Sequence, residues 1–113
     1  MTEPNVYLGG RMIPASQAHL AIYDAGIVLG ATVTDMTRTF HQKLFRLEDH
    51  VDRFFRSLKY VRIDIGLTPG ELTEVSNQLV AHNASLLEKE DELGLIFFAT
   101  PGEYPTYAGS AGG

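Results

Sequence analysis

Residues 45–63 read FRLEDHVDRFFRSLKYVRI, and this stretch carries the clearest periodic pattern in the sequence. Its apolar residues recur at the spacing of an amphipathic helix that begins near Leu47. They are Leu47, Val51, Phe54, Phe55, Leu58 and Val61. A turn of about 100° per residue places the charged side chains on the opposite face. The pattern predicts a helix with one side packed on a core and the other side in water.

The edge between these two faces carries His50, Arg53, Ser57 and Tyr60. An arginine between a histidine and a hydroxyl, at the border of a core, can bind an anion through charge-assisted hydrogen bonds. The alternative is an ordinary surface arginine, paired with Asp49 one turn earlier in the helix. The helix alone leaves both interpretations open.

Length and composition limit the classes of protein to which this chain can belong. A chain of 113 residues, 44% hydrophobic and 20% charged, is typical of one folded domain. Its net charge is −5 and its basic residues are spread along the sequence, which argues against nucleic acid or a membrane as partner. There is no cysteine, no membrane-spanning apolar run and no signal-peptide pattern. We therefore expect a soluble, cytoplasmic protein.

Several short segments predict strands. Residues 5–8 and 11–13 flank Gly9-Gly10, and two β-prone segments across a glycine pair indicate a hairpin. Residues 31–40 are rich in β-branched residues, so we expect a strand there, with 43–46 pairing back on it after a short turn.

A second helix and a last strand complete the pattern. Thr68 and Glu71 have the spacing of a capping box, which predicts a helix that runs to about Lys89. The run LGLIFFA at 93–99 is apolar throughout and predicts a buried strand. The order of these elements predicts an α+β domain, with an antiparallel sheet and two helices packed against it.

The strand at 31–40 is unusual because it is polar on both sides. Thr34, Met36 and Arg38 share one face, and Asp35 lies on the other with Val33. One side could line a wet cavity; alternatively, this is an edge strand with one solvated face. Arg38 must face solvent, a partner or an anion, and a cross-strand ion pair is its simplest alternative.

Other chemistry is not indicated. The four histidines are scattered without the spacing of metal ligands, so no metal site is predicted. No glycine-rich phosphate loop is followed by a helix, and no Gly-x-Ser-x-Gly motif is present.

The order of residues 23–63 resembles the N-terminal domain of the class IV, or fold type IV, aminotransferases, which use pyridoxal 5'-phosphate. The matching residues are Asp24-Ala-Gly26, Leu29-Gly30 and Val33-Thr-Asp35, followed by Arg38. The most specific part is Phe45-x-Leu-x-x-His-x-x-Arg-x-x-x-Ser, which ends at Ser57.

The resemblance implies roles for several residues. In this family the arginine at the position of Arg53 binds the cofactor phosphate, so Arg53 is expected to do so here, supported by His50 and Ser57. One face of the strand at 31–40 lines the substrate pocket in the family, which implies that Thr34, Met36 and Arg38 bind substrate. The implied activity is transfer of an amino group between an amino acid and a 2-oxo acid, in a homodimer.

The resemblance also implies that this chain is one part of such an enzyme. We expect residues 1–100 to form the small N-terminal domain and 101–113 a glycine-rich interdomain linker. The lysine that holds the cofactor covalently lies in a C-terminal domain that this chain lacks, so no catalytic residue is expected here and the chain alone should be inactive. The alternatives are an aminodeoxychorismate-lyase-like enzyme, or a non-catalytic α+β module that binds a small anion or a protein.

Overall fold

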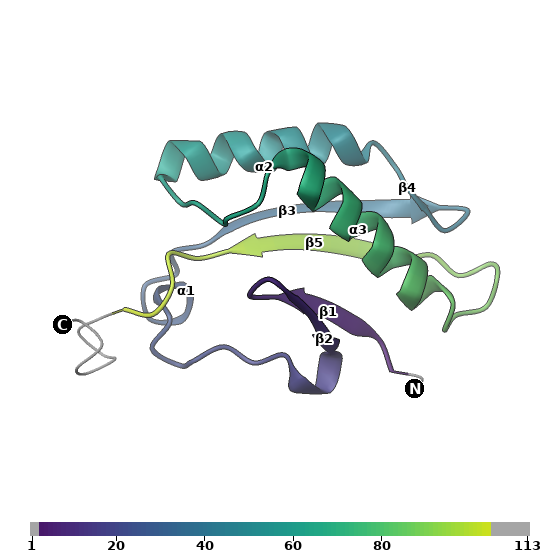
Figure 1. Cartoon of the computed structure of the whole chain (residues 1–113), viewed down its shortest axis with the longest axis horizontal. Helices are drawn as coiled ribbons and strands as arrows, with labels where there is room; N and C mark the ends of the chain where they lie inside the picture. The colour runs from purple at the N-terminus through teal and green to yellow at the C-terminus, as the bar shows by residue number, and fades with distance from the viewer. Residues whose placement is uncertain (1–2, 105–113) are drawn as a thin grey trace.

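A three-stranded antiparallel sheet lies at the centre of the computed structural model, which describes residues 3–104. Strand β3 (Val33–Phe40) is its middle strand, between β4 (Lys43–Leu44) and β5 (Gly94–Ala99). Helices α2 (Leu47–Val61) and α3 (Pro69–Ala84) pack over one face of this sheet, as Figure 1 shows. The predicted α+β architecture is confirmed.

A separate hairpin lies beside this unit. Strands β1 (Asn5–Leu8) and β2 (Arg11–Pro14) pair across Gly9 and Gly10, whose φ angles of 60° and 87° suit a tight hairpin turn. The side chain of Asn83 ties the hairpin to α3, because its amide accepts from the Asn5 N–H at 2.7 Å and donates to the Asn5 carbonyl at 3.0 Å. A short 3₁₀ turn (Ala15–Gln17) and helix α1 (Ala25–Val28) then lead into β3.

The core lies between the two helices and the sheet face that they cover. The predicted stripe of α2 supplies Val51, Phe54 and Leu58, and β5 supplies Leu95 and Phe97. The rings of Phe54 and Phe97 have centroids 5.2 Å apart. Val61, the last residue of the predicted stripe, is instead half exposed, because the helix ends there and Arg62 takes a left-handed conformation.

Two predictions about the second half of the chain are wrong in detail. The Thr68–Glu71 capping box begins α3 as predicted, but the helix ends at Ala84 and not near Lys89, and turns follow at Leu86 and Leu87. Strand β5 is buried on one side only: Leu95, Phe97 and Ala99 are buried, whereas Ile96 and Phe98 are 62% and 49% exposed. The helices cover one face of the sheet, so every second apolar residue of the run faces outward.

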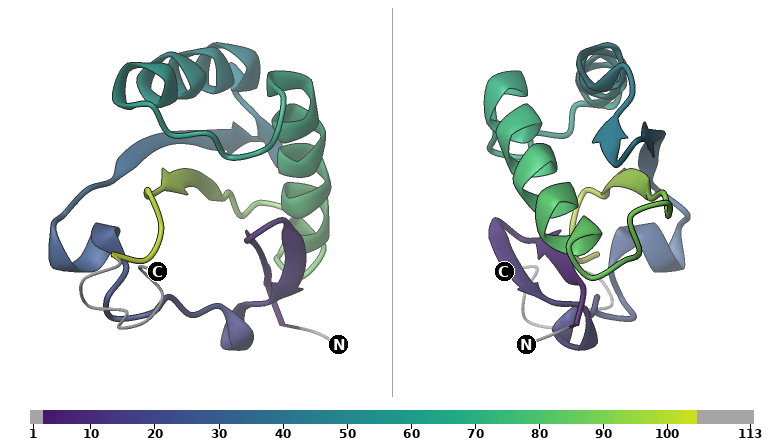
Figure 2. Two further views of the ribbon diagram at one scale, coloured as in Figure 1. Left: turned by 60° about the vertical axis from the view of Figure 1, so that its left-hand side comes forward. Right: turned by 90° about the vertical axis from the view of Figure 1, so that its right-hand side faces the viewer.

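The last described residues turn back onto α1. The Ala25 N–H donates to the Gly102 carbonyl at 2.8 Å, and the Tyr104 N–H donates to the Tyr23 carbonyl at 2.9 Å. In the left view of Figure 2 the yellow end of the chain reaches α1. The predicted linker at 101–113 therefore begins with docked residues, and its remaining part, 105–113, lies outside the described residues. Within residues 3–104, no helix is long and apolar enough to cross a membrane.

Candidate functional site

A buried carboxylate, Asp35, lies at the centre of the candidate site. The alternation of β3 points Asp35 toward α2, and its side chain is only 5% exposed. Its two oxygens accept hydrogen bonds from Arg53 Nε at 2.7 Å and from Arg53 Nη2 at 2.9 Å. His50 Nδ1 lies 2.8 Å from the same carboxylate.

Helix α2 presents His50 and Arg53 together because residues three apart are neighbours on a helix surface. The structure therefore brings His50 and Arg53 together at the predicted edge between the buried and exposed faces of α2, which we call the seam of α2. The residue that they bind, Asp35, comes from β3 and not from the helix. The predicted alternative pair of Arg53 with Asp49 is wrong, because Asp49 pairs with Arg46 instead. The distance from Arg46 Nη1 to Asp49 Oδ2 is 3.3 Å. Asp35 is the better partner, because its carboxylate is buried and offers both oxygens to the guanidinium fork.

The electrostatics of the pair favour the charged form of both groups. The hydrogen bonds from Arg53 hold the pKa of Asp35 well below its ordinary value, against the opposing effect of burial, and His50 adds to the lowering. Asp35 in turn raises the pKa of Arg53 through the same hydrogen bonds and its charge. Because Asp35 is ionised and can only accept, the contact at 2.8 Å requires Nδ1 of His50 to donate to it. Arg53 Nη2 also lies 3.3 Å from Nδ1 of His50.

Arg53 is anchored on one edge and open on the other. Its Nε and Nη2 bind Asp35, yet 59% of its side chain is exposed. Among the bonds that the structure shows for residues 3–104, none uses Nη1 of Arg53. An exposed guanidinium edge held in a fixed orientation is suited to bind an anion from solvent.

Ser57, the other predicted supporting residue, lies one turn further along α2 and is half buried. Its hydroxyl makes no bond to Asp35, His50 or Arg53 in the described structure. Its supporting role stays a prediction, while His50 is part of the cluster.

The three predicted substrate residues lie on the opposite face of β3. Thr34, Met36 and Arg38 are all exposed there, as the alternation of the sequence predicts. Arg38 stacks on Phe40, with its guanidinium carbon 4.1 Å from the ring centroid, and donates from Nε to the Thr39 carbonyl at 3.0 Å. The cross-strand ion pair proposed as its alternative is absent from the described residues.

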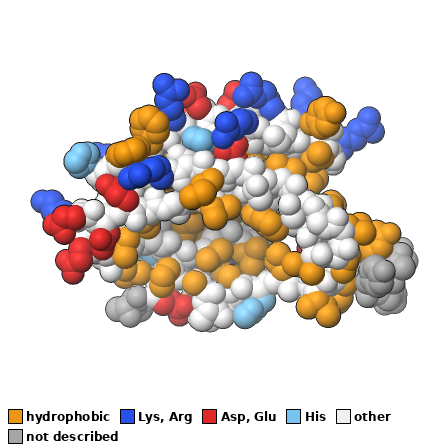
Figure 3. All heavy atoms as spheres, turned by 180° about the vertical axis from the view of Figure 1, so that it is seen from behind, with side chains coloured by type: hydrophobic (Ala, Val, Ile, Leu, Met, Phe, Trp, Pro, Cys, Tyr) orange, Lys and Arg blue, Asp and Glu red, His pale blue; other side chains and the backbone are white. Residues whose placement is uncertain are grey.

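Ile96 and Phe98 of β5 extend this open face, since they are the register partners of Met36 and Thr34. Seen from behind the view of Figure 1, hydrophobic side chains gather in a hollow across the middle of the molecule (Figure 3). Sequence reasoning missed these two residues because the apolar run looked buried. It also missed Asp35 as the partner of Arg53, although the strand alternation placed Asp35 on the face with buried Val33.

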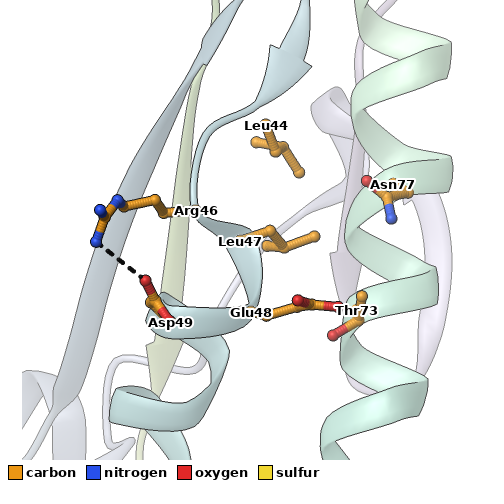
Figure 4. A pocket seen from close by; sticks show the side chains of 7 residues that line it. All are labelled: Leu44, Arg46, Leu47, Glu48, Asp49, Thr73 and Asn77. Atoms are coloured by element: carbon orange, nitrogen blue, oxygen red, sulfur yellow. Dashed lines mark hydrogen bonds and ion pairs between the residues drawn. The ribbon is translucent and has the colours of Figure 1, made fainter.

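The structure has pockets away from the Asp35 cluster. One, of about 350 Å³, lies between the first turn of α2 and α3. Figure 4 shows Arg46 pointing outward to Asp49, and Thr73 pointing from α3 toward the first turn of α2. Another, of about 450 Å³, lies between the tip of the β1–β2 hairpin, α3 and β5. Neither is lined by Asp35, His50 or Arg53. Within residues 3–104 there is no group of three or more histidine or acidic side chains placed to hold a metal ion.

Curated proteins that resemble this chain are aminotransferases. The D-alanine aminotransferase of Staphylococcus aureus (strain MSSA476) is 32% identical over 92 residues, which are 81% of this chain and 30% of that protein. A putative branched-chain-amino-acid aminotransferase of Methanocaldococcus jannaschii is 33% identical over 70 residues, 62% of this chain and 24% of that protein. The chain spans about 30% of the length of the curated relatives it matches. No protein-family model matches the sequence.

Solved structures give the same result. The branched-chain aminotransferase of Thermoproteus uzoniensis, solved with norvaline, has a TM-score of 0.75 and 25% identity, covering 86% of this chain and 33% of that one. A second branched-chain amino acid aminotransferase, solved with pyridoxamine 5'-phosphate, has a TM-score of 0.67 and 27% identity, covering 73% of this chain and 29% of that one. The chain is thus a homologue of the N-terminal part of the fold type IV aminotransferases.

Proposed function

We propose that this chain is the N-terminal part of a pyridoxal-phosphate-dependent aminotransferase that transfers an amino group between an amino acid and a 2-oxo acid. Its main contribution is Arg53, which binds the phosphate of the cofactor. The observation that carries this proposal is the geometry of Arg53: one edge is fixed to buried Asp35 and the other is exposed.

The donor set of the site fits a phosphate group. A phosphate ester offers several anionic oxygens, and a guanidinium edge can donate two parallel hydrogen bonds to them. Asp35 orients the arginine before the anion arrives, which lowers the entropy lost on binding. The solved relative that contains pyridoxamine 5'-phosphate supports this assignment by its chemistry. When bound, the cofactor would supply an electron sink for amino-group transfer.

Other residues of the chain have supporting roles in this proposal. His50 Nδ1 contacts Asp35 Oδ1, the oxygen that also accepts from Arg53 Nη2, and so helps to hold the carboxylate beside the arginine. Thr34, Met36 and Arg38 form one wall of the substrate pocket, with Ile96 and Phe98 beside them. This wall is mostly apolar with one cation, which suits an aliphatic amino acid whose carboxylate lies near Arg38.

The proposal assigns the remaining chemistry to parts outside this chain. The lysine that holds the cofactor covalently belongs to a C-terminal domain, so the 113-residue chain alone is expected to be inactive. The intact enzyme is expected to be a cytoplasmic homodimer. Family resemblance supports these statements, together with the fraction of its relatives that the chain spans.

The phosphate assignment is tested by titrating the intact protein with pyridoxal phosphate and following the absorbance of the bound cofactor. Arg53→Ala should weaken binding by at least about tenfold, because it removes charge-assisted hydrogen bonds worth more than about 1.4 kcal/mol. Arg56→Ala is the matched control, an exposed arginine on the same helix. Equal affinity of the Arg53→Ala variant and the wild type would overturn the assignment.

A further inference from the structure

Arg38, the cation on the open face of β3, has few polar contacts within the chain. Its register partner on β5 is Gly94, which has no side chain to hold it. Within residues 3–104, its one side-chain hydrogen bond runs from Nε to the Thr39 carbonyl at 3.0 Å, and neither Nη atom makes one. A long side chain with a single polar contact retains much rotamer freedom unless a packing contact restricts it.

The ring of Phe40 supplies such a packing contact. Phe40 lies two residues after Arg38 on the same face of β3, and the guanidinium carbon of Arg38 is 4.1 Å from the centroid of its ring. This distance is within the range of a cation–π interaction. Stacking occupies the flat face of a guanidinium and leaves the N–H donors at its edge available for hydrogen bonds.

Phe45 supports the ring of Phe40 in turn. The two rings meet edge to face, with their centroids 5.2 Å apart and their planes at 75°. Aromatic pairs in this arrangement are favourable beyond the area that they bury. The backbone of Phe45 is itself fixed to β3, because its N–H donates to the Arg38 carbonyl at 2.9 Å and its carbonyl accepts from Thr37 at 2.6 Å. Arg38 therefore rests on two rings that come from both sides of the β3–β4 turn.

The nearest acidic side chain leaves Arg38 available. The hydrogen bond from Thr39 is the largest cause of the lowered pKa of Glu92, and the charge of Arg38 is a minor one. The oxygens of Glu92 accept hydrogen bonds from Thr39, His41 and Gln42, and no ion pair joins Glu92 to Arg38 in the described part of the chain. The donors at the edge of Arg38 can therefore bind an anion from outside the chain.

We propose that Phe40, supported by Phe45, is a positioning residue that holds Arg38 in the orientation in which it binds the carboxylate of the substrate. The inference rests on the proposed function, because that function places the substrate carboxylate near Arg38. A stacked guanidinium has already lost part of its rotamer freedom, so less conformational entropy is lost when the carboxylate binds. Phe40 acts through Arg38 and does not itself contact the substrate.

The test measures, by calorimetry, the affinity of the intact, cofactor-loaded protein for pentanoate, an aliphatic carboxylate without a reactive amino or oxo group. Arg38→Ala should weaken pentanoate binding by at least about tenfold, because hydrogen bonds between charged groups are lost. Phe40→Leu should weaken it by about two- to fivefold, which is the contribution of a cation–π contact at an exposed site. Phe40→Tyr is the matched control: it keeps the ring and should keep wild-type affinity.

Two further measurements separate positioning of Arg38 from general damage to the wall. Pentanamide has the same carbon skeleton without the charge, so Phe40→Leu should bind it as the wild type does. When Phe40→Leu is added to Arg38→Ala, it should cause no further loss of pentanoate affinity, because its effect passes through Arg38. If Phe40→Leu does not fold, Phe40→Met replaces it, since methionine is also apolar and has no ring.

Three outcomes would overturn the inference while the proposed function stands. They are wild-type pentanoate affinity for Phe40→Leu, equal losses of affinity for pentanoate and pentanamide, and an undiminished loss when Phe40→Leu is added to Arg38→Ala. Unchanged pentanoate affinity for Arg38→Ala, or no binding of pentanoate to the wild type, would overturn both the inference and the proposed substrate role of Arg38. The phosphate assignment is tested separately, because it depends on Arg53 and on the affinity for pyridoxal phosphate.

Discussion

The two faces of β3 are built from alternating residues of one strand. Contacts within this chain hold the side chains of one face in place, whereas the other face is exposed. On the covered face, Asp35 binds Arg53 and His50, Thr37 donates to the Phe45 carbonyl at 2.6 Å, and Thr39 donates to Glu92 at 2.5 Å. On the open face, Met36 is more than half exposed. Contacts within the chain therefore fix Arg53, the proposed phosphate ligand, whereas the proposed substrate wall is left open in the described residues.

The largest expected difference between the faces concerns two neighbouring phenylalanines of β5. Phe97 is buried against Phe54, and Phe98 is half exposed on the open face. Phe97→Ala should lower the free energy of unfolding by about 3–5 kcal/mol, because it removes a packed ring from the core. Phe98→Ala should change it by about 0.5 kcal/mol or less. Denaturant unfolding of the two variants measures both values. Equal losses would show that the open face is as well packed as the covered one.

A smaller loss is expected when the buried carboxylate is replaced. Asp35→Asn should lower the free energy of unfolding by about 1–3 kcal/mol at neutral pH, since Arg53 loses a charged hydrogen-bond acceptor. The pKa of Asp35 is lowered in the folded state, so its stabilisation is present above about pH 4 and is lost as the pH falls further.

The difference between wild type and Asp35→Asn should therefore shrink in strong acid, which urea unfolding at several pH values can follow. Thr34→Asn, the adjacent residue on the open face, is the control and should show no such pH dependence. A pH-independent loss for Asp35→Asn would mean that the charge of Asp35 is not what stabilises the pair.

The smallest expected effect is at the exposed end of the covered face. Glu92 accepts the N–H groups of His41 at 2.9 Å and Gln42 at 3.0 Å, two residues with positive φ in the β3–β4 turn. These bonds, together with that from Thr39, lower the pKa of Glu92. Glu92→Gln should reduce thermal stability at neutral pH by less than Asp35→Asn does, with the difference fading below about pH 4.5 as the carboxylate protonates. An unchanged melting temperature of Glu92→Gln at pH 7 would argue that the β3–β4 turn does not depend on the charge of Glu92.

Local patterns in the sequence predicted most of the fold. The amphipathic spacing of α2, the capping box at Thr68 and the glycine pair of the hairpin each act over a few residues, so they can be recognised in isolation. The end of α3 was misjudged because Leu86 and Leu87 continue an apolar pattern without continuing the helix. The burial of only one face of β5 depends on which elements pack on each side of the sheet. A local run of residues does not contain that information.

The candidate site shows the same division. The position of Arg53 on the seam of α2 followed from helical spacing, and the shared face of Thr34, Met36 and Arg38 followed from strand alternation. The choice of Asp35 over Asp49 as the partner of Arg53 could not be read from the sequence, because it joins residues 18 apart through tertiary packing. An i, i+4 pair of Asp49 with Arg53 satisfies helical spacing as well, so spacing alone does not decide between the two partners.

The central claim is that Asp35 holds Arg53 in the orientation that binds a phosphate. The most direct test is the affinity of the intact protein for pyridoxal phosphate with Arg53→Lys, beside Arg53→Ala and Arg56→Ala. Lysine keeps the positive charge. Its single ammonium group, however, cannot bind both oxygens of Asp35 in the manner of a guanidinium and also present a second pair of N–H donors to the anion. The account predicts that Arg53→Lys loses most of the affinity lost by Arg53→Ala, while Arg56→Ala keeps wild-type affinity. Wild-type affinity for Arg53→Lys would contradict it, because positive charge alone would then suffice.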